Sequence, residues 1–211
     1  MRNRLLKLLP HDCLLCCCSL KKAAYFCHDC EVTLPWITDT TSSCKITLPT
    51  ICAPFRYQYP INRFITQLKF HQQLRYARIL SQLFLKWYQS QQRILPQVLI
   101  PVPLHKKRLR QRGFNQALEI TKHLGRALQI PIDTQHCQRV KNTTPQSSLN
   151  AKQRRQNVNN AFHIQEKMKY QRIALVDDVI TTGHTMQSLV TRYVQYNVHI
   201  ECWSCALSLI N

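Results

Sequence analysis

Glycine and acidic residues are both scarce in this sequence of 211 residues, which contains three glycines and ten aspartates and glutamates. Against those ten acids stand 29 lysines and arginines, and the formal net charge at pH 7 is +19. This excess argues against a surface of balanced charge and predicts binding to polyanions, with nucleic acid as the first candidate. Anionic metabolites are the second candidate, and an anionic membrane surface is the third.

Long hydrophobic runs are also missing. No apolar stretch approaches the roughly 20 residues that a membrane-spanning helix needs, so we expect no transmembrane segment. Lys7, Pro10 and His11 interrupt the apolar residues near the basic N-terminus, which argues against a signal peptide and predicts a cytoplasmic protein. With 45% hydrophobic residues, the chain is long enough for one α/β domain with a sizeable core and a small appendage.

Two of the few acidic residues, Asp177 and Asp178, are adjacent and follow the apolar residues 173–176. So short an apolar run predicts a strand that is buried on both faces, as in a parallel sheet. Open α/β sheets bind their ligands at the carboxyl ends of the strands, which makes both aspartates candidate binding residues. Ionised carboxylates accept hydrogen bonds but cannot donate them, so the pair suits ribose hydroxyls or a metal ion that bridges to them.

A loop rich in hydroxyl groups follows the two aspartates. A glycine in this loop can take a positive φ, and the apolar positions from Met186 to Val194 predict that a helix begins after it. The free N–H groups and the dipole of this helix would face the loop, which predicts a phosphate site. The alternative is an ordinary strand, turn and helix with a threonine N-cap. The loop residues assigned to the phosphate are Thr181, Thr182, Gly183, His184 and Thr185.

Residues 176–185 resemble the motif with which type I phosphoribosyltransferases bind 5-phosphoribosyl 1-diphosphate (PRPP). The resemblance implies an α/β fold with a parallel sheet and flanking helices. It also implies that Asp177 and Asp178 hold the 2′ and 3′ hydroxyls of the ribose, that the threonine and glycine loop holds the 5′-phosphate, and that Mg²⁺ binds with PRPP. His184 stands where a small residue is usual.

Eight of the eleven cysteines lie within the first 52 residues. Two CxxC pairs are separated by ten residues, and thiolates at that spacing can close a tetrahedron around zinc. A site of four cysteines leaves no coordination position open, so its role would be structural. We expect a zinc-binding module in residues 1–55 and a second domain in residues 56–211. The expected ligands are Cys13, Cys16, Cys27 and Cys30. The alternatives are a segment without metal, or a ligand set that includes Cys17, Cys18, Cys44, Cys52 or His28.

Dense positive charge follows a second apolar strand, predicted at residues 98–100. Such charge is costly through self-repulsion unless an anion shares it, and arginine can bind either a diphosphate or a nucleic-acid backbone in bidentate fashion. Asn115 or Gln116 would then begin a helix that runs to Leu128. The polar segment 139–157 is either a solvated loop or a lid over the diphosphate. The basic residues assigned to the diphosphate or DNA backbone are Lys106, Lys107, Arg108, Arg110, Arg112 and Arg154.

The remaining patterns predict helices and strands. Apolar residues at helical spacing predict one long helix, or two, between residues 64 and 92. Lys69 is most simply a residue of the solvated face of that helix, with a ligand role as the alternative. Short strands are expected at 130–132 and at 198–207. Cys202 and Cys205 would point to opposite faces of the last strand, which favours core packing over metal or redox chemistry.

Taken together, these motifs resemble the ComF family, including its GntX-like members, from about residue 10 to residue 207. The resemblance implies a zinc module joined to a phosphoribosyltransferase-like domain. It further implies the handling of imported single-stranded DNA in the cytosol during natural transformation, with other DNA-uptake proteins as possible partners. Members often have a further pair of CxxC motifs, which this sequence lacks. The resemblance rests on both CxxC pairs and on residues 67–70, 102–104, 112–116, 146–162 and 176–185.

Three functions follow from these patterns. In the first, which we expect, a competence protein holds single-stranded DNA in a basic groove and has PRPP or a related phosphosugar as its ligand. In the second, the protein is an active phosphoribosyltransferase, although the sequence identifies no acceptor. In the third, it is a regulator that senses PRPP. The aromatic residues nearest to basic ones either stack nucleic-acid bases or belong to the core; they are Tyr57, Tyr59, Phe70 and Phe114.

Overall fold

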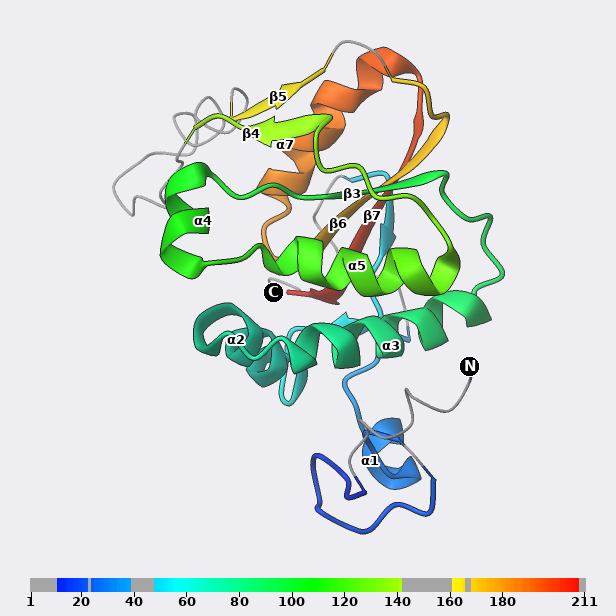
Figure 1. Ribbon diagram of the computed structural model, residues 1–211. Coiled ribbons are helices and arrows are strands. Elements are labelled where there is room, and N and C mark those ends of the chain that lie inside the picture. The colour runs from blue at the N-terminus through cyan, green and yellow to red at the C-terminus, as the bar shows by residue number, and fades with distance from the viewer. Residues whose placement is uncertain (1–10, 23, 39–47, 142–160, 166–167, 209–211) are drawn as a thin grey trace.

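The computed structural model describes residues 11–22, 24–38, 48–141, 161–165 and 168–208. Its centre is a sheet in which every strand pairing is parallel, as expected for an α/β fold (Figure 1). In spatial order its strands are β1 (Thr50–Cys52), β7 (His199–Leu207), β6 (Arg172–Ile180) and β3 (Val98–Pro101), with β2 (Phe55–Arg56) also paired to β7.

Helices cover both faces of this sheet, which explains why its central strands are apolar on both sides (Figure 1). Ala174 and Val176 of β6 belong to the core under three of the helices, whereas Ile173 and Leu175 belong to the core on the opposite face. The three helices on the first face are α2 (Ile61–His71), α3 (Arg75–Ser90) and α5 (Gln116–Leu128). The opposite face carries α7 (His184–Tyr193), the 3₁₀ helix η2 (Val194–Tyr196) and a two-stranded antiparallel sheet of β4 (Cys137–Arg139) and β5 (Phe162–Ile164).

Several predicted elements are confirmed. The helical pattern of residues 64–92 corresponds to two helices, α2 and α3, because Gln72 ends α2 in the left-handed conformation with φ 53°. Asn115 begins α5, and its side chain accepts a hydrogen bond from the N–H of Ala117 at 3.0 Å. Cys202 and Cys205 are buried in the two different cores, as the alternation of a strand requires.

Other parts of the fold differ from the predictions. The expected strand 130–132 is reduced to a single parallel bridge between Leu99 and Ile132. The basic segment after β3 forms a helix, α4 (Lys106–Arg112), although it has no apolar stripe. His105 caps α4, since its Nδ1 accepts from the N–H of Lys107 at 3.2 Å. β1 lies within residues 1–55 but pairs with β7, so we propose that the domain boundary precedes β1.

The cysteine-rich segment packs against the main domain rather than standing apart from it. The ring of Phe26 lies 6.0 Å from that of Phe64 in α2. Glu31 of α1 (His28–Val32) forms an ion pair with Lys86 of α3. Residues 35–37 also bond to residues 54–56 through backbone hydrogen bonds of 2.8 Å. The two parts of the chain therefore share one hydrophobic core.

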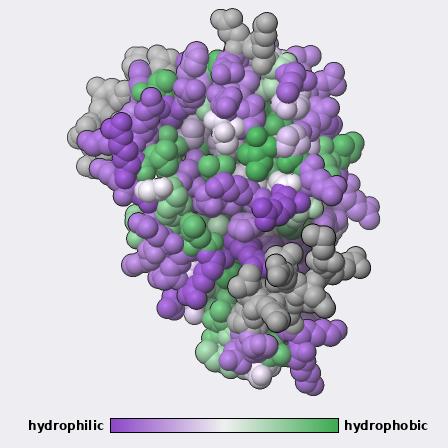
Figure 2. All heavy atoms as spheres, viewed as in Figure 1, coloured by the Kyte–Doolittle hydropathy of each residue, from purple (hydrophilic) through white to green (hydrophobic). Residues whose placement is uncertain are grey.

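Hydrophilic residues cover most of the face shown in Figure 2, and its apolar residues form separate groups. Among the described residues, no helix combines the length and the apolar character that crossing a bilayer requires.

Candidate functional site

The two adjacent aspartates lie on opposite faces of the sheet. β6 does not end at Val176 but continues to Ile180, and Asp177 is paired with Ser204 of β7. Because successive side chains of a strand alternate between its faces, Asp178 points toward α2 and Asp177 points to the side of the following loop. The carboxyl end of β6 thus contributes one carboxylate to each face.

Asp177 and the loop after β6 surround a small pocket of about 40 Å³. All five loop residues predicted to bind phosphate, 181–185, line it together with this aspartate. Gly183 has φ 74°, which only glycine adopts at little cost, and it begins α7. No side chain of the described residues caps the first turn of α7, so its N–H groups and its positive dipole end are available to an anion. Thr182 Oγ1 lies 2.9 Å from Nδ1 of His184.

The surroundings of Asp177 disfavour ionisation of its carboxyl group. Burial raises its pKa well above the ordinary value, the neighbouring charge of Asp178 raises it further, and Lys69 partly opposes both effects. A bound cation, or hydroxyl groups that donate to the carboxylate, would stabilise the charged form. The group is therefore suited to a ligand that brings positive charge or hydrogen-bond donors with it.

Asp178 is engaged by Lys69 of α2. Lys69 Nζ lies 2.6 Å from Oδ2 of Asp178, and the two side chains are 20% and 6% exposed. Burial lowers the pKa of Lys69, but the attraction of Asp178 outweighs it, so the pKa is raised overall. The interpretation of Lys69 as a solvated residue is thus wrong. The sequence held a signal, because Lys69 follows the buried Ile61 and Ile65 at intervals of four residues.

The predicted cationic residues of α4 separate into two groups. Arg108 and Arg112 line a second pocket of about 300 Å³ between α2 and α4, together with Lys69 and Phe70. Lys106, Lys107 and Arg110 are exposed and do not line it. Arg154, Cys44 and residues 142–157 of the predicted lid lie outside the described residues.

The four candidate stacking residues also divide by exposure. Tyr57 and Phe114 are partly buried and pack against the core under α2, α3 and α5. Tyr59 and Phe70 are 64% and 67% exposed. Exposure therefore leaves Tyr59 and Phe70 as the better candidates for stacking with a base.

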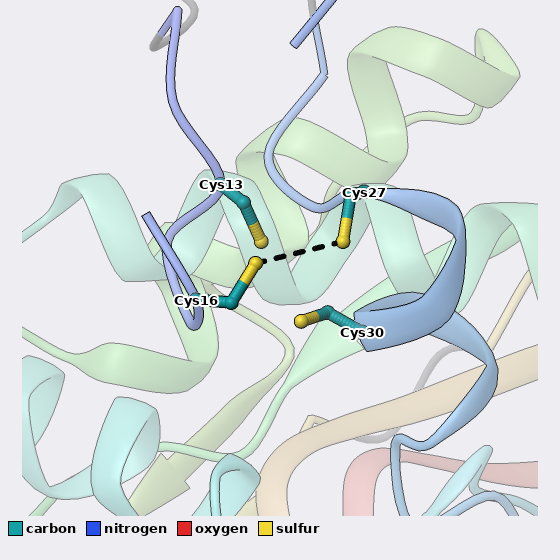
Figure 3. A group of neighbouring side chains, drawn as sticks. All are labelled: Cys13, Cys16, Cys27 and Cys30. Atoms are coloured by element: carbon teal, nitrogen blue, oxygen red, sulfur yellow. Dashed lines mark hydrogen bonds between the residues drawn. The ribbon is translucent and has the colours of Figure 1, made fainter. Parts of the chain in front are cut away.

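The four cysteines of the CxxC pairs come together at one point (Figure 3). All four sulfur atoms lie within 4.8 Å of one another, and the Sγ atoms of Cys16 and Cys27 are 3.7 Å apart. Four thiolates at about 2.3 Å from a zinc ion would be roughly 3.8 Å apart in a tetrahedron. The geometry and the donor set both fit a structural metal ion.

The pKa values of the thiols in this cluster also fit a bound metal ion. Burial raises the pKa of Cys13, but hydrogen bonds from the backbone of Cys16 and Cys27 outweigh it and lower the pKa to about 6. The thiol of Cys16 raises the pKa of Cys30. Thiols this close cannot all ionise unless a cation compensates their charge.

The alternative ligands that lie within the described residues do not join the cluster. Cys17, Cys18 and His28 are exposed and lie outside the group of four. Cys52 is fully buried elsewhere, with its Sγ 3.7 Å from Oε2 of Glu201. Among the described residues, the two intact CxxC pairs are thus the set that can hold a metal ion.

Comparison with known proteins gives relatives that are named for competence or for DNA utilization. No protein-family model matches the chain. Competence protein F of Haemophilus influenzae is 38% identical over 158 residues, which are 71% of this chain and 69% of that protein. DNA utilization protein YhgH of Escherichia coli K12 is 34% identical over 137 residues, or 63% of this chain and 60% of that protein. The YhgH of Salmonella typhimurium is 33% identical over the same shares. The chain thus spans less than two thirds of the length of the YhgH proteins.

Proposed function

Because this chain belongs to the ComF family, we propose that it binds PRPP and single-stranded DNA in the cytosol and takes part in handling imported DNA. The relatives are named for competence and for DNA utilization, which supports a role of that kind. Their names say nothing of PRPP or of single strands, so these two ligands are proposed from the residues of this chain.

The observation that carries the proposal is the pocket formed by Asp177 and residues 181–185. A phosphate would accept hydrogen bonds from the first N–H groups of α7 and from the threonine hydroxyls, and the dipole of α7 would favour its charge. The sugar would extend from this phosphate toward Asp177, whose carboxylate accepts from ribose hydroxyls. Mg²⁺ would bind with the diphosphate of PRPP and neutralise part of its charge.

Positive charge supports the DNA part of the proposal. The chain carries a formal net charge of +19, and α4 places five cationic residues in one short helix, two of which line the pocket that contains Lys69. A flexible single strand can follow such a surface because its phosphates are accessible from all sides. The four-cysteine cluster would hold structural zinc, which supplies stabilisation that the small module cannot draw from a core of its own.

Calorimetric titration of PRPP in the presence of Mg²⁺ tests the pocket. We expect Asp177→Asn to weaken binding at least tenfold, because the amide accepts from ribose less strongly than a carboxylate and does not attract Mg²⁺. Asp29→Asn, an exposed change on α1, is the matched control and leaves the affinity unchanged. An unaltered affinity of the Asp177 variant would refute the proposed site.

Phosphoribosyl transfer is the second candidate. It is favoured by the pocket of about 300 Å³ between α2 and α4, which provides room for an acceptor and is lined by Lys69, the ion-pair partner of Asp178. Transfer releases pyrophosphate, so PRPP is incubated with the protein and with nucleobases or oligonucleotides, and pyrophosphate is measured. A rate of pyrophosphate release no higher than that of Asp177→Asn would leave binding as the function.

A transformation assay and a single-strand DNA pull-down on Asp177→Asn separate the two parts of the proposal. If the variant loses transformation but still captures DNA, sugar-phosphate binding is distinct from strand holding.

A further inference from the structure

We propose that the pocket between α2 and α4 binds one unpaired nucleotide, whose base stacks on Phe70 and whose phosphate is held by Arg108 and Arg112. This inference rests on the proposed function and names a subsite for it. The residues that line the pocket are Lys69, Phe70, Gln72, Arg108, Gln111 and Arg112.

Phe70 has the exposure that a stacking residue needs. It stands near the end of α2 with 67% of its surface exposed, whereas Phe64 and Leu68 of the same helix are buried in the core. A side chain this exposed contributes little to folding. An aromatic ring offers a flat face to any base, and stacking of this kind tolerates differences of sequence.

Arg112 links the aromatic and the cationic parts of the pocket. Its guanidinium lies 5.5 Å from the centre of the Phe70 ring, within the range of a cation–π contact, which orders both side chains. Burial lowers the pKa of Arg112, Asp178 opposes this effect, and the charge of Arg108 adds to the lowering. Two arginines that repel each other in the same pocket gain from a shared anion, and their planar forks fit a phosphate in bidentate geometry.

The remaining lining groups fit the edge of a base. Gln72 and Gln111 carry amides that both donate and accept hydrogen bonds, so they can meet any of the four bases. About 300 Å³ is at the lower end of the sizes of small-molecule sites, which suits one nucleotide. The base must be unpaired, because stacking on a protein ring requires a free face.

The pocket is linked through Lys69 to the strand that carries the proposed sugar-phosphate site. Lys69 lines it while holding Asp178, the neighbour of Asp177 in β6. A nucleotide in this pocket would therefore contact Lys69, whose ion-pair partner Asp178 is the chain neighbour of the PRPP-site residue Asp177.

Binding of two fluorescent oligonucleotides of equal length tests the inference, one of thymidines and one of abasic residues. We expect the wild type to bind the thymidine strand at least fivefold more tightly, the lower limit for one stacked base. Phe70→Ala should bring the two affinities close together, while Phe70→Tyr, which keeps the ring, should preserve the difference. Val194→Ala removes an equally exposed apolar side chain on η2 and should change neither affinity. Arg112→Ala should weaken both strands.

Competition with thymidine monophosphate tests whether the pocket binds a free nucleotide or a nucleotide of a DNA strand. Displacement of the strand from the wild type, but not from Phe70→Ala, would assign the pocket to free nucleotides, and no displacement would assign it to a strand. If both strands bind equally and Phe70→Ala changes nothing, this subsite is wrong while the DNA function stands. If neither strand binds, the proposed DNA function fails as well. Displacement of the thymidine strand by an acidic peptide, dependent on Phe70, would overturn the nucleotide assignment.

Discussion

Asp177 and Asp178 are neighbours in the sequence but meet opposite environments. Lys69 compensates the charge of Asp178 at 2.6 Å. Asp177 has no ion-pair partner among the described residues, and burial raises its pKa. The fold thus stabilises the charge of one carboxylate and disfavours ionisation of the other. The pair illustrates how a shift of one residue along a strand changes the role of a side chain.

Replacing each aspartate by asparagine is expected to change the stability of the protein in opposite directions. At pH 7, Asp178→Asn should lower the free energy of unfolding by about 2 kcal/mol, because it leaves the ammonium of Lys69 mostly buried without a partner. Asp177→Asn should raise the midpoint of thermal unfolding in the absence of ligand, because it removes a carboxyl group whose ionisation the fold disfavours. Both are measured by thermal and urea unfolding.

The pH dependence provides the check on Asp177. The folded state binds the proton of Asp177 more tightly than the unfolded state, whose pKa is about 3.9. As pH rises from that value toward the folded pKa, the wild type therefore loses stability. The advantage of Asp177→Asn should disappear below about pH 4, where the group is protonated in both states. If Asp177→Asn stayed more stable than the wild type below about pH 4, ionisation of Asp177 would not be the cause of the difference.

At the scale of elements, the sequence predicted those with a repeating apolar pattern. α3 and α5 show helical spacing, and β3 shows a continuous apolar run, so each was found close to its observed bounds. β1, β2, β4 and β5 have only two or three residues each, too few to show any period. α4 has no apolar stripe, and it is defined by its His105 cap and by Gly113 at φ 81°.

Gly125 of α5 shows a close approach that the sequence did not reveal. A Cβ at this position would lie 2.9 Å from the carbonyl oxygen of Ile130 and 2.9 Å from Cγ1 of Ile132. Glycine lets the chain after α5 turn back over the helix, where Ile132 bridges to Leu99 of β3. This packing fixes α5 against the edge of the sheet.

Gly125→Ala should therefore destabilise the protein although alanine favours helix. The gain in helix propensity is about 1 kcal/mol, whereas forcing an extra methyl group against backbone typically costs about 1–3 kcal/mol. We expect a net loss of roughly 1 kcal/mol in urea unfolding. Arg126→Ala, at the adjacent exposed position, should change stability by less than about 0.5 kcal/mol. A more stable Gly125 variant would show that residues 130–132 move away easily.

At the scale of the whole molecule, the fold has two cores, and most of the buried residues of the cysteine module belong to one of them. Phe26, Leu34 and Cys13 are buried in the same cluster as residues of α2 and α3. The opposite core, which includes Leu189 of α7, contains Ile37 but none of these three residues. Loss of the metal should therefore affect α2 and α3 more than α7.

Removal of the metal by a chelator should unfold the module and leave the sheet folded. We expect hydrogen exchange to increase in residues 11–38 and, to a smaller extent, in α2 and α3, while β6 and β7 stay protected. Cys16→Ser should reproduce the effect, since three thiolates hold zinc less well than four. Cys17→Ser, outside the group, should retain the metal in elemental analysis. Equal metal content in the two variants would exclude the four-cysteine site.

The candidate site was predicted only as far as local sequence determines it. The cysteine spacing and the loop 181–185 are both features of short segments of sequence. In the structure the four cysteines lie together at one point, and the loop residues lie together around a separate pocket. The contact between Lys69 and Asp178 joins residues more than a hundred positions apart. This contact depends on how far β6 extends and on how α2 crosses its end, and the local sequence pattern predicts neither.

The charge of the whole molecule leads to the last prediction, which concerns where DNA binds. If the net charge of +19 acted only as a general field, any loss of two cations would weaken DNA binding equally. If α4 contacts the phosphates, the loss of two cations from α4 should weaken DNA binding more than the loss of two cations elsewhere. Lys106→Ala with Lys107→Ala should reduce the slope of log affinity against log salt by about 1.4, since each phosphate contact to a single strand contributes about 0.7. Lys122→Ala with Arg126→Ala removes the same charge from the exposed side of α5 and should leave the slope unchanged. Equal slopes in the two double variants, measured by fluorescence anisotropy from 50 to about 300 mM salt, would mean that α4 is not the DNA surface.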